Sequence, residues 1–206
     1  MKHSISIAVF TGLLATNALS AIFHIDAGGR VPAEANQTRS TNPATFNFTV
    51  AGMLPIIVDV NLHLDMVHSW DEDLEIRLIS PGGTNVLLFN QLPGGPPRFD
   101  DFDDTTFDQQ AANPITAGTA PYTGAYRPQG NLNDFNGQNP NGVWRLWIFD
   151  HRLGDYGWVY RAGDPQFETR RGPLSGTRLE IVAVPEPLSW MVLAGSLGWF
   201  VLRRRR

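Results

Sequence analysis

Hydrophobic and polar residues alternate in short stretches of this chain, which is the pattern of β-strands with one buried face. The clearest stretch runs from Val58 to Met66, and Phe46 to Val50 alternates in the same way. Strict alternation predicts that one face packs in a core while the other meets water. In the longer stretch the apolar face holds Val58, Val60, Leu62, Leu64 and Met66, and the polar face holds Asp59, Asn61, His63 and Asp65.

Further strands are predicted between turn signals. Residues 74–79 end at a Ser-Pro-Gly-Gly turn, after which residues 85–89 return as a hairpin partner. Residues 142–150 carry apolar side chains on both faces and predict a central strand, while residues 156–160 and 178–184 supply the last two. Residues 91–129 are rich in Pro, Gly, Asp and Thr and predict long loops with short strands. The whole predicts an all-β protein, a β-sandwich.

The first residues of the chain predict an export signal. Lys2 and His3 precede an apolar stretch from Ile5 to Leu14, and residues 18–21 offer small side chains for cleavage near Ser20 or Ala21. This is the pattern of a secretory signal peptide, here residues 1–21, with a signal helix that is removed after export. The body is therefore expected to pass through the Sec translocon and leave the cytoplasm.

A second apolar segment follows the predicted sandwich. Leu188 to Leu202 is uncharged and would form a single transmembrane helix of about 22 Å, short of the ~30 Å hydrocarbon core, so interfacial tryptophans and snorkelling arginines must help it cross. Prolines restrict the backbone before the run to extended conformations. The positive-inside rule keeps the terminal arginines cytoplasmic. The flanking residues are Pro185, Glu186 and Pro187 before the run, and Arg203, Arg204, Arg205 and Arg206 after it.

This order of motif, apolar run and arginine cluster in residues 185–206 resembles the bacterial PEP-CTERM sorting signal. The resemblance implies that exosortase, a membrane enzyme of bacteria that make exopolysaccharide, reads and removes the tail. The protein would be held transiently in the inner membrane with its C-terminus cytoplasmic, and would then reach the cell surface or the extracellular space. An ordinary C-terminal membrane anchor is the alternative.

The composition of the body between Ile22 and Val184 limits its number of domains, its partners and its sources of stability. Its length of about 160 residues suits one domain. Residues 22–45 are polar with little periodicity and are expected to be loosely held, and residues 46–184 are expected to form the sandwich. Eleven arginines against 19 acidic residues give a net charge of −8, which argues against nucleic acid as a partner. The chain has no cysteine, so stability must come from the core or a bound cation.

Five sequence fragments follow one another along the chain: residues 68–84 (HSWDEDLEIRLISPGGT), 105–108 (TTFD), 126–128 (YRP), 142–146 (GVWRL), and Asp150 with 154–157 (GDYG). In this order they resemble the P domain (P/Homo B domain) of proprotein convertases and their bacterial relatives. The resemblance implies a jelly-roll-like β-sandwich that, in convertases, packs beside a subtilisin-like catalytic domain and stabilises it. Residues 161–176 depart from the usual family pattern, and the closing strand lacks the tryptophan that family members usually carry there.

The residues argue against catalysis. A serine hydrolase needs a serine with a histidine base and an orienting acid, and none of the serines lies in a Gly-x-Ser-x-Gly elbow. His63 and His68 are five residues apart on one strand, so they lie on opposite faces, and His68 is expected to satisfy loop backbone groups at the strand end. The chain is expected not to be an enzyme.

The acidic segment around Phe102 is the candidate site. Its carboxylates repel one another unless they are solvated or bind a cation, and extracellular calcium suits an all-oxygen site. A solvated loop with Phe102 and Phe107 tucked inward is the alternative. The candidate calcium ligands are Asp100, Asp101, Asp103, Asp104 and Asp108.

Two further groups of residues have a structural and a binding interpretation. The acids Asp71, Glu72, Asp73, Asp150 and Asp155 lie at turns, where backbone capping is their common use. Trp70, Trp144, Trp147 and Trp158 either pack in the core or stack on sugar rings. The favoured function is therefore an exported, non-catalytic structural or binding module, with an exopolysaccharide or an envelope protein as partner. The alternative is an accessory domain that stabilises a separate subtilisin-like protease.

Overall fold

The computed structural model describes residues 17–31, 42–93, 100–152, 156–164 and 176–186. Two β-sheets pack face to face, and the described helices are three short 3-10 turns, Asp71–Asp73, Ile115–Ala117 and Leu132–Phe135. The predicted all-β sandwich is confirmed, while its jelly-roll connectivity stays a prediction. None of the helices in the described residues is long and apolar enough to span a membrane. The predicted signal helix and transmembrane helix lie outside the described residues, apart from the end of the signal segment.

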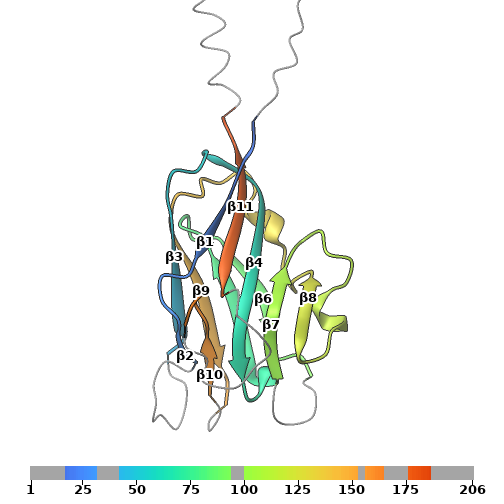
Figure 1. Cartoon of the computed structure of the whole chain (residues 1–206). Helices are drawn as coiled ribbons and strands as arrows, with labels where there is room; N and C mark the ends of the chain where they lie inside the picture. Colours follow the sequence, from blue (N-terminus) through green and yellow to red (C-terminus); the bar gives the residue numbers. More distant parts are fainter. Residues whose placement is uncertain (1–16, 32–41, 94–99, 153–155, 165–175, 187–206) are drawn as a thin grey trace, which may run out of the picture.

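The larger sheet is built around the long strand β4 (Ile56–His68). Along one edge of β4 lie β11 (Arg178–Val184) and then β10 (Gly157–Val159), and along the other edge lies β7 (Asp100–Phe107). The outer strands are β1 (Leu19–His24) beside β11, β2 (Gly29–Val31) beside β10, and β8 (Tyr122–Tyr126), which pairs in parallel with β7. Figure 1 shows β11, β4, β7 and β8 side by side.

The smaller sheet has the order β3 (Ala44–Val50), β9 (Gly142–Asp150), β5 (Leu74–Ile79) and β6 (Asn85–Asn90), all antiparallel. The predicted strands at residues 74–79 and 142–150 are found with those bounds, and residues 85–89 form the predicted hairpin partner. β9 is central, as its two apolar faces indicate. Alternation of β3 is complete: every second residue from Ala44 to Val50 is buried.

The core lies between the sheets and is filled by aliphatic and aromatic side chains from both. Trp144 of β9 is fully buried, packs its ring 4.9 Å from that of Phe135, and donates its indole N–H to the Pro140 carbonyl at 2.8 Å. A second aromatic group joins the edge of the larger sheet to the core. Its members are Phe89, Phe102, Phe107, Tyr122 and Tyr126.

Two predictions about irregular segments are wrong. Residues 22–45, expected to be loosely held, contain half of β1, all of β2 and the start of β3, and Ile25 is buried in the core. Residues 100–107, expected to be a loop, form β7, because β4 and β8 satisfy their backbone groups on both sides. Val58 is also misplaced: a register shift opposite Val182 and Ala183 turns it outward, and Ile57 takes the buried position.

Candidate functional site

The acidic strand β7 presents its aromatic residues to the core, while Asp104 and Thr106 lie on the outer face of the larger sheet. Phe102 and Phe107 are buried, so the predicted inward position of both rings is confirmed. The strand bulges at Asp104, whose φ of 51° lies in the left-handed region. The bulge interrupts the register with both β4 and β8 and turns the Asp104 side chain to the surface.

Asp65 of β4 holds this bulge in place. Its carboxylate is buried and accepts the Asp104 backbone N–H at 2.9 Å and the Gly176 backbone N–H at 2.5 Å. Its backbone carbonyl accepts from the Tyr160 N–H at 3.0 Å and from the Thr177 hydroxyl at 3.1 Å. The sequence placed Asp65 on the polar face but did not indicate its burial, because the groups that cover it lie far along the chain.

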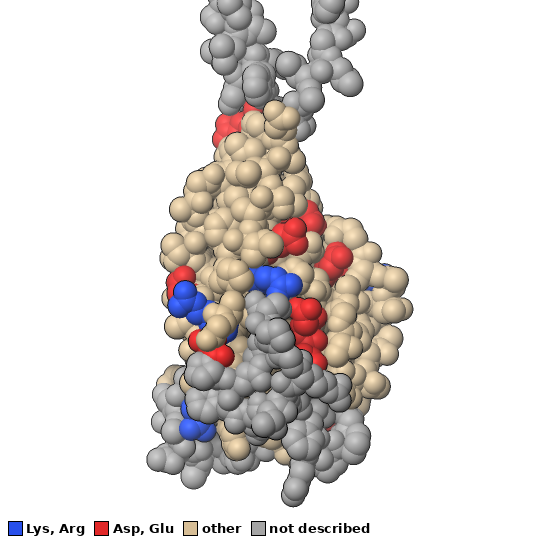
Figure 2. All heavy atoms as spheres, viewed as in Figure 1, with Lys and Arg blue, Asp and Glu red and all other residues tan. Residues whose placement is uncertain are grey.

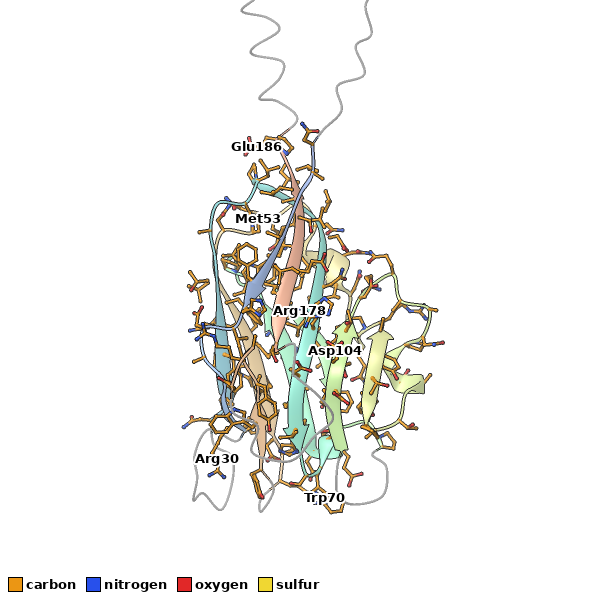
Figure 3. All side chains as sticks on the ribbon, in the orientation of Figure 1. Arg30, Met53, Trp70, Asp104, Arg178 and Glu186 are labelled. Atoms are coloured by element: carbon orange, nitrogen blue, oxygen red, sulfur yellow. The ribbon has the colours of Figure 1, made fainter. Side chains whose placement is uncertain are left out.

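His63, on the same outer face, is the centre of a polar network that joins three strands. Its Nδ1 lies 2.8 Å from the Thr106 hydroxyl and 3.2 Å from Nη2 of Arg178, and its Nε2 lies 3.6 Å from a Glu180 oxygen. Arg178 also reaches Asp104 at 3.5 Å, and Figure 3 shows the two side chains near one another. Burial and then the Arg178 charge lower the pKa of His63.

The network has the residue types of a nucleophile, a base and an acid, but its geometry opposes catalysis. Arg178 is always a donor, so the Nδ1 that faces Thr106 is already an acceptor of the guanidinium N–H. A proton taken from the Thr106 hydroxyl would place an imidazolium charge against that guanidinium, which is unfavourable. The arrangement therefore ties β4, β7 and β11 together.

The residues proposed as calcium ligands are spread along β7 and the residue after it. Asp104 is paired with Arg178, and Asp108 lies at the end of β7, near Asp59, where burial and then the Asp108 charge raise the pKa of Asp59. Asp100 and Asp101 stand opposite His68 and Val67 in the register. Among the described residues, no three His, Cys, Asp or Glu side chains come together as metal ligands do. Calcium binding stays a prediction.

If calcium binds the native state through this segment, it should stabilise the fold by about 1.4 kcal/mol at ten times its Kd. That gain corresponds to a rise in Tm of roughly 2–4 °C for a domain of this size. Thermal melts of the purified chain in calcium and in excess chelator measure the difference, and the double variant Asp101→Asn with Asp103→Asn should abolish it. Equal melting temperatures in calcium and chelator would show that the segment is only solvated.

The lower end of the sandwich in Figure 3, around Trp70, holds a second polar cluster, in which His68, Asp73 and Asp150 are buried. His68 accepts the Trp70 backbone N–H at 3.1 Å, and its Nε2 lies 3.5 Å from Oδ2 of Asp150. Asp150 accepts the Arg152 backbone N–H at 3.0 Å, and Arg152 Nε lies 3.3 Å from Asp73. The predicted use of His68 and Asp150 for backbone groups is confirmed, and the cluster joins the ends of β4, β5 and β9.

Residues 57–161 match the family described as "Proprotein convertase P-domain", which is about half of the chain and contains the cluster around His68 together with His63 and Thr106. The chain belongs to the proprotein convertase P-domain family. The P domain is a non-catalytic accessory domain, which agrees with the geometry of the His63 network. No curated protein matches the chain.

Two solved structures resemble this P domain. One is the serine protease of Aeromonas sobria in complex with its chaperone ORF2, at 21% identity and a TM-score of 0.44, covering 84% of this chain and 28% of the other. The second is the serine protease of Aeromonas sobria, at 20% identity and a TM-score of 0.42, covering 83% of this chain and 28% of the other. The chain thus spans little more than a quarter of the length of these proteins.

The four tryptophans of the P domain have different positions. Trp144 belongs to the core, and Trp70 and Trp158 are partly buried near the lower end of the larger sheet. Trp147 lies on the outer face of the smaller sheet, beside Phe149. The sequence could not tell which of Trp144 and Trp147 is buried, because β9 carries apolar residues on both of its faces.

Only part of the predicted sorting signal is described. Pro185 and Glu186 follow β11 directly, and Glu186 is exposed. Pro187, the apolar run and Arg203 to Arg206 lie outside the described residues. The predicted cleavage region overlaps β1, because Leu19, Ser20 and Ala21 pair with Ala183, Val182 and Ile181.

Proposed function

We propose that this chain is an exported, non-catalytic P-domain module that exosortase sorts to the cell envelope or extracellular matrix, where it has a structural or binding role. The Sec translocon would export it through the N-terminal signal. The observation that carries the proposal is the antiparallel pairing of β1 with β11, which sets Leu19 opposite Ala183. Both apolar ends of the chain are therefore connected to the same end of the sandwich (Figure 1).

This arrangement suits a domain whose two ends meet one membrane. During export the signal segment and the apolar run would both lie in the inner membrane. The sandwich would lie outside the membrane and be connected to it at one end only. A domain with its ends at opposite sides could not do this without long linkers. The polar network around His63 and the buried cluster around His68 both lie further along the sandwich, away from that end.

The structure also supports access to the two processing sites. Glu186 is exposed two residues after β11 ends, with Pro185 next to it to keep the backbone extended. Cleavage after Ser20 or Ala21 would shorten β1 but leave Ile22, Phe23 and His24 paired with Glu180, Leu179 and Arg178. The mature domain would keep half of this strand pair.

In a host with exosortase we expect the surface-exposed protein to lack the C-terminal tail, and Glu186→Ala with Pro187→Ala to retain it on most molecules. Both substitutions remove the extended, acidic segment that the enzyme would read. Mass spectrometry of the C-terminus of surface protein measures the result. Glu180→Ala, which removes the acidic residue nearest the motif in β11, is the matched control and should be processed normally.

Intact Arg206 on most of the surface-exposed wild-type protein would contradict the sorting proposal. It would favour an ordinary membrane anchor, in which the arginines stay cytoplasmic.

A second function is favoured by the family itself. P domains accompany serine proteases, so this chain could stabilise a separately encoded subtilisin-like protease. Affinity purification of the mature protein from its host separates the two functions. A subtilisin-like protease recovered in stoichiometric amount, and losing thermal stability when the P domain is deleted, would establish the accessory role.

A further inference from the structure

The outer face of the smaller sheet carries a row of apolar and aromatic side chains along its central strand. The outward residues of β9 are Val143, Arg145, Trp147 and Phe149, followed by His151 just beyond the strand. Val143 is 48% exposed, and the two rings are only partly buried. Because the core already lies on the other face, the packing of the sandwich does not require aromatic residues here.

The aromatic residues of this row contact one another in sequence. The rings of Trp147 and Phe149 are nearly parallel, at 13°, with centroids 5.8 Å apart, and the His151 ring meets Phe149 edge-on at 4.8 Å. Neighbouring outward residues of a strand are spaced by roughly 6.6–6.8 Å. The rings therefore form a continuous strip that runs along β9.

Hydrogen-bonding side chains border the strip on both neighbouring strands. The register sets Thr45 of β3 and Arg77 of β5 on the two sides of Trp147, and Glu75 of β5 beside Phe149. Glu75 is held in place by Arg77 and by His151, whose Nε2 lies 3.2 Å from it. A narrow aromatic strip between polar groups suits a sugar chain, whereas a stable protein interface needs a broader apolar centre.

The charge on this face differs from that on the other sheet. Arg145 is exposed between Val143 and Trp147 and forms no ion pair within the described residues. On the larger sheet, acidic and basic side chains lie close together (Figure 2), and Arg178 is 3.5 Å from Asp104. Although the body as a whole is acidic, this strip therefore offers an unpaired guanidinium to a ligand that carries carboxylates.

We propose that the outer face of β9 binds an acidic polysaccharide, with sugar rings against Trp147 and Phe149 and a uronate carboxylate at Arg145. Thr45, Arg77 and Glu75 would bond the sugar hydroxyl groups. This inference deepens the binding role proposed above by naming the ligand class. Its test is independent of sorting, because C-terminal processing does not involve this face.

The test is calorimetric titration of the purified full chain, in a non-ionic detergent, with alginate oligosaccharides and with uncharged cello-oligosaccharides of the same length. We expect alginate to bind more tightly, and to bind more weakly as salt rises. Trp147→Ala should lower affinity for alginate by about tenfold, or about 1.4 kcal/mol, because the sugar ring loses the aromatic surface on which it stacks. Arg145→Gln should remove the preference for alginate.

Two control variants separate a loss of binding from a loss of folding. Trp147→Phe keeps a ring and should keep alginate affinity within a few-fold, and Tyr156→Ala removes an aromatic side chain that is 60% exposed elsewhere and should leave it unchanged. The proposal is overturned if no alginate binding is measured, if Trp147→Ala binds like the wild type while melting at the same temperature, or if Arg145→Gln keeps the preference. Capture of a protein partner through Trp147 in place of alginate would also overturn it.

Discussion

Replacing Asp65 by alanine should lower the free energy of unfolding by about 3 kcal/mol. The buried carboxylate accepts the backbone N–H groups of Asp104 and Gly176, and alanine would leave both donors without that acceptor. A hydrogen bond to a charged group contributes roughly 1.5–3 kcal/mol, and an unsatisfied buried donor adds its own desolvation penalty. Urea denaturation of the purified chain measures the loss as a shift of the midpoint at constant slope.

Asp59→Asn is the matched control for this experiment, since Asp59 lies on the same face of the same strand. Burial and then the charge of Asp108 raise the pKa of Asp59, so folding disfavours its ionised form above the pKa of the unfolded chain. At neutral pH the substitution should therefore leave stability unchanged or raise it slightly. If Asp65→Ala unfolds at the same urea concentration as the wild type, the carboxylate does not hold the bulge.

Gly157→Ala should destabilise the lower end of the sandwich by about 2–3 kcal/mol. A Cβ at this position would lie 2.2 Å from the Val67 carbonyl oxygen and 2.6 Å from Cδ2 of His68. The first of these atoms belongs to the backbone of β4, so β10 would have to move away from β4. Because β10 also pairs with β2, the movement would disturb the β10–β4 and β10–β2 pairs and the contact of His68 with Asp150.

The effect of Gly157→Ala is measured by urea denaturation and by hydrogen exchange at the β10 amides. Gly82→Ala is its control: the nearest atoms to an added Cβ are side-chain oxygens of Gln138 and Ser80, at 3.6 and 3.8 Å, and stability should change by less than about 0.5 kcal/mol. Unchanged protection of the β10 amides in Gly157→Ala would show that the strand accommodates a methyl group.

The sequence by itself determined the strands whose pattern is local. Alternation with period 2 predicted β3, most of β4 and β11, and apolar residues on both faces predicted the central position of β9. The turn at residues 80–83 predicted the β5–β6 hairpin, because Pro and Gly restrict the backbone within a few residues. The order of the P-domain fragments gave the family before the fold was known.

The sequence misjudged segments whose strand character depends on partners. Asp and Thr have low or context-dependent strand propensity, so residues 100–107 resemble a loop until β4 and β8 pair with them. Residues 22–31 form only short strands, and their pairing with β11 and β10 comes from contacts about 130–160 residues away.

Only the tertiary structure decided which polar residues act together. His63, Thr106 and Arg178 meet because three strands lie side by side in one register, and Asp65 is buried because the Asp104 bulge and Gly176 cover it. Trp147 and Trp144 have the same local pattern, yet one faces solvent and the other fills the core. The strand geometry places neighbouring side chains on opposite faces of a sheet, but the packing of the second sheet decides which of the two faces is buried.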